Sequence, residues 1–194
     1  MPVTRMASGA GLGRMLTAGL VGLSLGQPGA VAAQQSSVAF TVSGNSTVRG
    51  WTCTVPGTAQ VTKGSSTPVR GLDGGVQAAT LTVRVSDFVC PDDEMRQHLL
   101  EAMRATQFPE ITFRLQGYQA SGQGVVATGT LTILDATRDV SLPISLTPSG
   151  SGVQIAGALP LDMTIYGVEP PVVMLGLMRV RPQIRIEFAG NLTP

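Results

Sequence analysis

The feature of this chain that most constrains its fold is an alternation of apolar and polar residues along much of its length. Successive side chains of a β-strand point to opposite faces, so an apolar residue at every second position predicts a strand that buries one face. Stretches rich in Gly, Pro and Ser at 63–75, 121–124 and 148–152 interrupt the alternation and predict turns. We expect about eight strands in all. Three of them show the pattern in Val38, Phe40 and Val42, in Leu81, Val83 and Val85, and in Ile184, Ile186 and Phe188.

A single segment, 91–107, has a helical pattern instead. Asp92 and Asp93 can cap its start and suit the positive end of the helix dipole, and Pro109 marks its end. Its apolar residues share one face at spacings of three and four, namely Met95, Leu99, Ala102 and Met103. Strands that are buried on one side only close into an antiparallel barrel or pack as a sandwich. The predicted fold class is therefore all-β and mainly antiparallel, with one inserted α-helix.

Residues 1–33 have the features of a secretory signal. Arg5 and Arg14 give a positive start, 15–25 is apolar and uncharged, and small residues at the end of the segment suit cleavage. The apolar run is shorter than the roughly 18 residues that span a bilayer. We predict a Sec-type signal peptide at 1–33, with an uncleaved anchor as the alternative. The mature chain, 34–194, is then one domain in the periplasm or secreted.

The two cysteines, Cys53 and Cys90, both lie beyond this signal. Export places them in an oxidising compartment, where paired thiols become disulfides. A redox pair is the alternative, but redox pairs usually stand close together as Cys-x-x-Cys. We therefore expect a structural disulfide, which is worth roughly 3 to 4 kcal/mol in the chain-entropy description.

Charge and composition argue against several functions. The formal net charge of the 194 residues is +1, whereas a nucleic-acid surface needs an excess of Lys and Arg. His98 is the one histidine, so the sequence has no His-Glu-x-x-His motif, and no Gly-x-Ser-x-Gly elbow supplies a nucleophile. The acidic run 92–94 is explained more simply as a helix cap than as a cation site. We expect no catalysis, no metal and no cofactor.

Four ordered stretches together resemble the YceI-like family of exported lipid- and polyisoprenoid-binding proteins. They are Ser-Thr-Val-Arg-Gly-Trp at 46–51, the helical segment that runs into Phe-Pro-Glu-Ile-Thr-Phe at 95–113, Gly-Thr-Leu-Thr-Ile through Leu-Pro at 129–143, and Met-Thr-Ile-Tyr-Gly-Val-Glu-Pro-Pro at 163–171. The chain departs from the family pattern at Arg49, where the nearest branch often has His, and at Asp135, Ala136 and Asp139. The resemblance implies a lipocalin-like, up-and-down β-barrel with a helix over one end.

A barrel of about eight strands can hold one elongated apolar ligand. Because burial contributes about 0.8 kcal/mol per CH₂ group, such a ligand binds without special polar contacts. With the resemblance, this predicts a non-enzymatic carrier of a polyisoprenoid or fatty-acyl lipid, in which Arg49 and Arg138 are candidates to pair with a headgroup. The candidate ligand contacts, each of which would otherwise be core, are Phe40, Trp51, Leu81, Val83, Phe88, Leu99, Met103, Phe113, Met163, Tyr166 and Met174.

The sequence leaves other functions open. A structural or interaction barrel with a packed core is the main alternative, and the low aromatic content of 4% slightly favours it. An outer-membrane barrel needs two aromatic girdles, which so few aromatic residues do not supply. We expect a small apolar lipid as partner, no nucleic acid, no stable membrane insertion after signal cleavage, and a monomer or homodimer.

Overall fold

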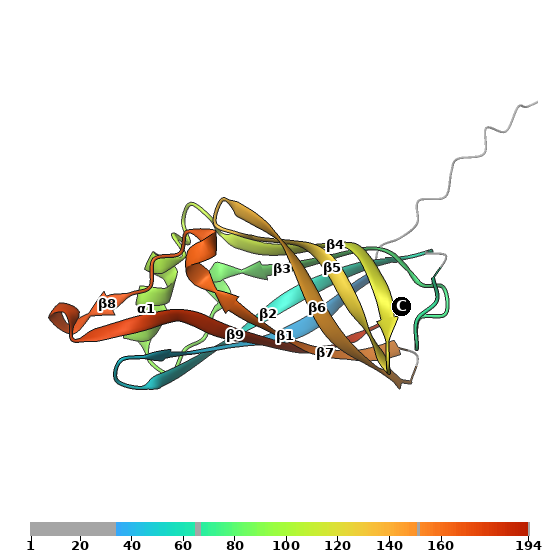
Figure 1. The fold of residues 1–194 in the computed structure, drawn as a ribbon, viewed down its shortest axis with the longest axis horizontal. Coiled ribbons are helices and arrows are strands. Elements are labelled where there is room, and N and C mark those ends of the chain that lie inside the picture. The colour runs from blue at the N-terminus through green and yellow to red at the C-terminus, as the bar shows by residue number, and fades with distance from the viewer. Residues whose placement is uncertain (1–33, 65–66, 151, 194) are drawn as a thin grey trace, which may run out of the picture. The chain divides into compact units, whose positions relative to one another are not determined.

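The computed structural model describes residues 34–64, 67–150 and 152–193. They form a closed antiparallel β-barrel with one α-helix, which confirms the predicted fold class (Figure 1). Neighbouring strands pair in chain order up to β7, and β9 closes the barrel by pairing with both β7 and β1. The predicted signal peptide at 1–33 lies outside the described residues. The barrel strands are β1 (Gln34–Ser46), β2 (Gly50–Lys63), β3 (Val76–Arg84), β4 (Glu110–Ser121), β5 (Gly124–Ile133), β6 (Ala136–Ser149), β7 (Gly152–Asp162) and β9 (Met178–Leu192).

The remaining elements gather at one end of the barrel (Figure 1). They are η1 (Val85–Asp87), α1 (Asp93–Ala102), η2 (Met163–Tyr166), β8 (Val172–Val173) and η3 (Met174–Gly176). The short strand β8 pairs with the first residues of β9, Val172 with Arg179 and Val173 with Met178. The resulting β8–β9 hairpin projects beyond α1 (Figure 1).

The helix predicted at 91–107 forms over Asp93–Ala102. Asp92 is its N-cap, as expected: the backbone N–H of Met95 donates to Asp92 Oδ1 at 2.7 Å. The helix ends earlier than predicted, because the chain turns at Arg104, whose φ of 45° a continuing α-helix does not allow.

The predicted disulfide joins Cys53 of β2 to Cys90, which precedes α1, across a sequence separation of 37 residues. Beside it, Thr54 and Val89 exchange two backbone hydrogen bonds of 2.8 Å each. The disulfide and these hydrogen bonds together attach the approach to α1 to the barrel wall.

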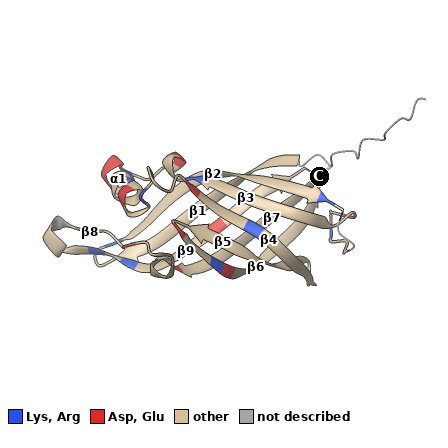
Figure 2. Ribbon diagram, turned by 90° about the horizontal axis from the view of Figure 1, so that it is seen from above, with Lys and Arg blue, Asp and Glu red and all other residues tan. Residues whose placement is uncertain are grey.

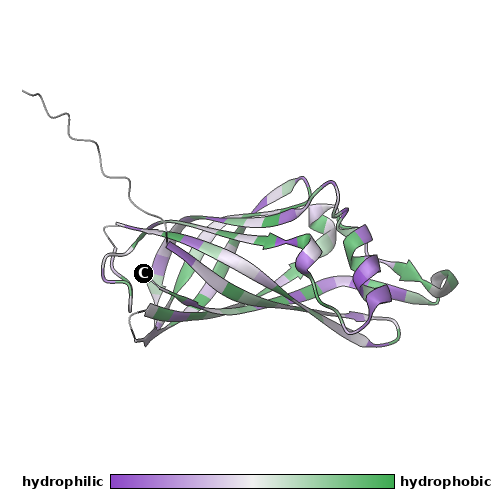
Figure 3. Cartoon of the chain, turned by 180° about the vertical axis from the view of Figure 1, so that it is seen from behind, coloured by the Kyte–Doolittle hydropathy of each residue, from purple (hydrophilic) through white to green (hydrophobic). Residues whose placement is uncertain are grey.

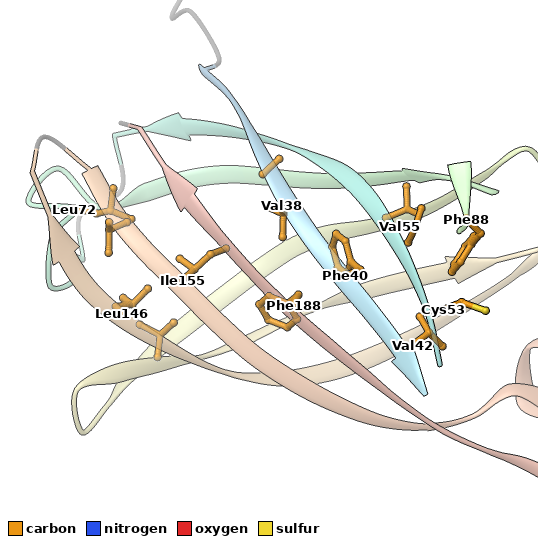
Figure 4. Close-up of a cluster of buried hydrophobic side chains, with 14 residues drawn as sticks. Val38, Phe40, Val42, Cys53, Val55, Leu72, Phe88, Leu146, Ile155 and Phe188 are labelled. Atoms are coloured by element: carbon orange, nitrogen blue, oxygen red, sulfur yellow. The ribbon is translucent and has the colours of Figure 1, made fainter. Parts of the chain in front are cut away.

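The end of the barrel opposite α1 is packed with side chains, and we call it the filled end (Figure 4). At its inner limit, the rings of Phe40 on β1 and Phe188 on β9 lie with their centroids 6.1 Å apart. Glycines give these rings room: a Cβ atom at Gly57 would lie 2.6 Å from the Phe40 ring, and one at Gly157 would overlap the Phe188 ring. Beyond the two rings, the buried residues of the filled end include Val38, Leu72, Leu146 and Ile155.

The loop between β2 and β3 closes the filled end. Its Leu72 is 5% exposed and belongs to the same buried cluster as Leu146 and Val153. Tyr118 of β4 holds the loop, because its hydroxyl donates to the Thr67 carbonyl at 2.6 Å and accepts from the Val76 N–H at 2.9 Å. The inner faces of the strands at the filled end are therefore in contact with other protein side chains.

Hydrophilic and hydrophobic residues alternate along the strands, as Figure 3 shows.

Candidate functional site

A cavity of about 600 Å³ lies at the other end of the barrel, beneath α1. Its wall is formed by inward-facing apolar side chains of the strands, among them Val42, Ile111, Ile133, Leu161, Ile184 and Ile186. We call this region the hollow end. The volume is within the range of roughly 300 to 1,000 Å³ that is typical of sites for small molecules.

Helix α1 forms the roof of the cavity. The apolar face predicted from the sequence, Met95, Leu99, Ala102 and Met103, lines the cavity. An amphipathic helix usually buries this face against packed side chains, yet no residue of α1 is fully buried. The face borders empty space, so an apolar ligand beneath the helix would complete its burial.

The segment from η2 to β9 forms a further wall. It contributes Met163, Val168, Pro171, Val173, Met178 and Val180. The start of η2 is capped by Asp162, whose Oδ1 accepts hydrogen bonds from the hydroxyl and the N–H of Thr164. These hydrogen bonds hold the pKa of the Asp162 carboxyl below its usual value. This cap fixes the direction of the chain that carries Met163 into the cavity.

Charged residues of the cavity lie at its rim. Arg49, at the turn between β1 and β2, places Nη2 3.7 Å from Asp92 Oδ2 at the start of α1, and both side chains are largely exposed. Glu94 is also exposed and lines the same rim, on the acidic helix that Figure 2 shows in red. We infer from these exposed lining residues that the cavity opens near the first turn of α1 and the β1–β2 turn. This arrangement suits a ligand with an apolar body and a polar end directed to solvent.

His98 and Trp51 are the polar aromatic residues of the cavity lining. His98 Nε2 lies 3.6 Å from Glu94 Oε1, and its Nδ1 lies 3.7 Å from Glu101 Oε2. Within the described structure, His98 Nε2 and Trp51 Nε1 are buried without a hydrogen-bond partner. The Trp51 ring packs on the backbone of Gly44, where a Cβ atom would lie 2.6 Å from Cζ2. Trp51 also borders a more open groove on the outside of the barrel, beside Gln183 and Arg185.

The structure separates the predicted ligand contacts into two groups. Five of them line the cavity: Trp51, Phe88, Leu99, Met103 and Met163. Five others pack in the core away from it: Phe40, Leu81, Val83, Phe113 and Tyr166. The side chain of Met174 lies outside the described part of the chain. Alternation in the sequence identifies inward-facing residues, but it does not give their height along the barrel, which decides between cavity and core.

The two candidate headgroup partners also differ in position. Arg49 lines the cavity at its rim. Arg138 is not part of the lining, and its Nε and Nη2 both donate to the carbonyl of Ile165 at 3.3 Å. Arg138 thus holds η2 against β6, whereas Arg49 can reach a ligand that enters the opening.

Sequence reasoning missed many lining residues, among them seven on β9 and on the segment that precedes it. Ile184 and Ile186 belong to the alternation of the last strand, so their inward direction was recognisable from the sequence. Val168 and Pro171 belong to irregular backbone and Val173 to the two-residue strand β8, and no periodic sequence signal placed these residues at the cavity.

Tyr166, a predicted ligand contact and the last residue of η2, is completely buried. Its hydroxyl has no hydrogen-bond partner among the described residues. Burial raises the pKa of this hydroxyl, and the nearby positive charge of Arg138 offsets part of the effect.

Among the residues that the structure describes, no three His, Cys, Asp or Glu side chains come close enough together to hold a metal ion. No helix within the described ranges is long and apolar enough to cross a bilayer.

Comparison with known proteins agrees with the architecture. A search of curated proteins found no match. Among solved structures, BcnA from Burkholderia cenocepacia is 21% identical, with a TM-score of 0.62 over 81% of this chain and 96% of that one. A mutant YceI protein from Campylobacter jejuni with a monobromobimane guest is 13% identical, with a TM-score of 0.57 over 71% of this chain and 81% of that one.

A polyisoprenoid binding domain from Saccharophagus degradans, implicated in plant cell wall breakdown, is 12% identical, with a TM-score of 0.59 over 84% of this chain and all of that one. At these identities the likeness shows a shared fold. The family model for the YceI-like domain matches residues 30–192, which is nearly the whole domain after the predicted signal. The chain belongs to the YceI-like domain family.

Proposed function

We propose that this protein is a periplasmic or secreted binding protein for an elongated apolar lipid of the polyisoprenoid or fatty-acyl type. The observation that carries the proposal is the cavity beneath α1, whose lining is mainly apolar, with Trp51 and His98 as its polar aromatic members and charged residues at its rim. Among the described lining residues, His98 lies beside Glu94 and Glu101. The Ser46 hydroxyl donates to the Arg49 carbonyl, so no contact among the described lining residues pairs a nucleophile with a base. Binding rather than catalysis is therefore the activity we assign.

The form of the cavity supports a chain-like ligand. Met95, Met103 and Met163 lie on its roof and one wall, and methionine side chains adapt to ligands of irregular shape. Each CH₂ group that leaves water contributes about 0.8 kcal/mol. A chain of several isoprene or CH₂ units would thus bind firmly, with its polar end near Arg49 at the rim.

Known relatives support the same class of ligand. The Saccharophagus degradans structure is of a polyisoprenoid binding domain, and this chain shares its fold. The main alternative, a barrel with a packed core and no ligand, requires the space beneath α1 to be filled. The cavity volume of about 600 Å³ argues against that alternative.

Quenching of tryptophan fluorescence tests the proposal. Trp51 is the one tryptophan of the chain and lines the cavity, so a dibrominated stearate bound there will quench it by contact. We expect saturable quenching of the delipidated protein at one lipid per chain, reversed by an excess of unbrominated stearate or a polyprenol. The absence of saturable quenching by both brominated stearate and a brominated polyprenol would overturn the proposal.

A matched pair of variants locates the binding site. Ala102→Phe places a ring into the cavity from α1, whereas Ala189→Phe places the same ring on the exposed outer face of β9. We expect the first variant to lose quenching and the second to retain it, provided that both give the circular dichroism of the parent protein. Equal quenching in the two variants would place the ligand elsewhere.

A further inference from the structure

A run of seven apolar residues at 172–178, Val-Val-Met-Leu-Gly-Leu-Met, forms the projecting β8–β9 hairpin. Such a run would normally be buried, yet Leu175 is fully exposed, Leu177 is 77% exposed and Val172 is 55% exposed. Figure 3 shows the hydrophobic colour at this tip. Surface apolar residues that occur singly need no explanation, but an adjoining group of large ones marks an interaction site.

A second hairpin adds to this group. Val48, at the turn between β1 and β2, is 68% exposed. The neighbouring Thr47 ties the two hairpins together, since its N–H donates to the Arg179 carbonyl at 2.9 Å and its hydroxyl donates to the Leu177 carbonyl at 3.1 Å. We call Val48, Val172, Leu175 and Leu177 the apolar tip.

The backbone of the tip is also unusual. Leu175 and Gly176 both have positive φ, 54° and 91°, the combination that a tight hairpin turn requires at its two central residues. Gly or Asn usually occupies such positions, and a leucine there is strained. Because Leu175 contacts solvent, packing within the protein does not explain its presence.

Charge favours an anionic surface as the partner of the tip. From Pro170 to Ile186 the chain carries Arg179, Arg181 and Arg185 and no acidic residue. Other acidic groups of this end, such as those of α1, Asp162 at the start of η2 and Asp135 beside Arg104, lie outside the stretch 170–186. Arg185 pairs with Glu187 of the same strand at 2.9 Å, which leaves Arg179 and Arg181 as the arginines nearest the tip. Figure 2 shows red α1 apart from blue β9. A second copy of the chain would bring like charges together, whereas anionic phospholipid headgroups attract arginines.

The tip adjoins the opening of the cavity. Val48 belongs to both, and Val173 and Met178, which flank the exposed residues of the hairpin, point into the cavity. A bilayer that received the tip would thus lie against the opening. A lipid could then move between bilayer and cavity without crossing water.

We propose that the apolar tip docks reversibly on an anionic phospholipid bilayer and presents the cavity to it. Leu175 and Leu177 enter the headgroup region, while Arg179 and Arg181 pair with phosphates. Docking goes beyond the proposed lipid binding, because it depends on the exposed residues of the apolar tip. Docking and lipid binding can therefore fail independently.

Flotation with vesicles tests the docking. The probe is the mature protein with vesicles of phosphatidylglycerol and phosphatidylcholine, compared with phosphatidylcholine alone. We expect binding to the anionic vesicles that weakens with salt. The double variant Leu175→Ser, Leu177→Ser should bind about a hundredfold more weakly, and Arg181→Gln about fivefold more weakly. Val126→Ser and Arg114→Gln, on the barrel wall, are the controls and should bind as the parent does.

Two further readouts separate the possible outcomes. In the Trp51→Phe, Leu175→Trp variant, the new tryptophan should shift its emission to the blue on anionic vesicles. Quenching of Trp51 by dibrominated stearate should be unchanged in the Leu175→Ser, Leu177→Ser variant, because neither residue lines the cavity. Equal vesicle binding by the parent and the double variant would overturn the proposal. So would a parent protein that does not bind anionic vesicles. A leucine-dependent dimer without vesicle binding would assign the tip to a second copy instead.

Discussion

The two ends of the barrel are built from the same alternating strands but differ in what occupies the interior. In the filled end, two phenylalanine rings meet over glycines and Leu72 enters from a loop, so side chains occupy the space between the walls. In the hollow end, the inward residues are mainly Val, Ile and Leu, and α1 covers the space without filling it. A few large residues at mid-height thus decide where the barrel is solid and where it can receive a ligand.

The largest expected effect comes from emptying the filled end. Phe188→Ala removes a buried ring, and we expect it to lower the free energy of unfolding by about 3 to 5 kcal/mol, measured by urea denaturation. Met103→Ala, in the roof of the hollow end, removes a side chain that already borders a cavity. It should cost less than about 2 kcal/mol. Equal losses of unfolding free energy in Phe188→Ala and Met103→Ala would contradict the described difference between the filled end and the hollow end.

The disulfide supports the hollow end, where Cys53 itself lines the cavity. Replacing both cysteines, Cys53→Ala and Cys90→Ala, should lower the free energy of unfolding by about 3 to 4 kcal/mol, the loop-closure value for this separation. Lipid affinity should fall as well, because the disulfide attaches the approach to α1 to β2. Reduction of the parent protein with dithiothreitol is the control and should give the same loss. An unchanged unfolding midpoint after complete reduction would contradict the expectation.

A smaller effect should follow from adding one methyl group in the middle of the barrel. Gly157→Ala places a Cβ atom against the Phe188 ring and 2.8 Å from the Pro143 carbonyl oxygen. We expect a loss of about 1 to 3 kcal/mol from overpacking. The control is Gly74→Ala, where nothing lies within 4 Å of the added atom. If both variants unfold at the same urea concentration, the close packing around Phe188 is not as described.

The smallest expected effect concerns Tyr166, whose buried hydroxyl has no partner among the described residues. Tyr166→Phe should be neutral or stabilising by about 1 kcal/mol near pH 7. Because burial raises the pKa of this hydroxyl in the folded state, the native protein keeps its proton where the unfolded chain loses it. The parent should therefore lose stability as the pH rises above about 10. The Tyr166→Phe variant should lose less stability over the same pH range. Parallel plots of unfolding free energy against pH for the two proteins would contradict this account.

Much of this architecture could be predicted from the sequence. Alternation identified the strands, Asp92 identified the start of the helix, and the resemblance supplied the closed barrel and the position of the helix over one end. The disulfide was predicted from two cysteines that follow a predicted export signal. The predictions of strands and of the helix start rest on local patterns, which can be recognised in short segments of the sequence.

The division of the interior could not be predicted in the same way. Phe40 and Trp51 both belong to inward-facing positions of neighbouring strands, yet one packs in the core and the other lines the cavity. Their heights depend on the register between strands and on the tilt of the barrel, which are properties of the closed sheet. Val168 and Pro171 reach the cavity through irregular backbone, for which the sequence has no periodic signal.

Bromine anomalous diffraction offers the most direct test of a hollow end that receives lipid. Crystals of the protein grown with a saturating dibrominated fatty acid should show bromine peaks beneath α1, between Leu99, Met163 and Ile186. Peaks in the filled end or on the outer wall would contradict the account. So would a barrel with no bound bromine, in which side chains occupy the space beneath the helix.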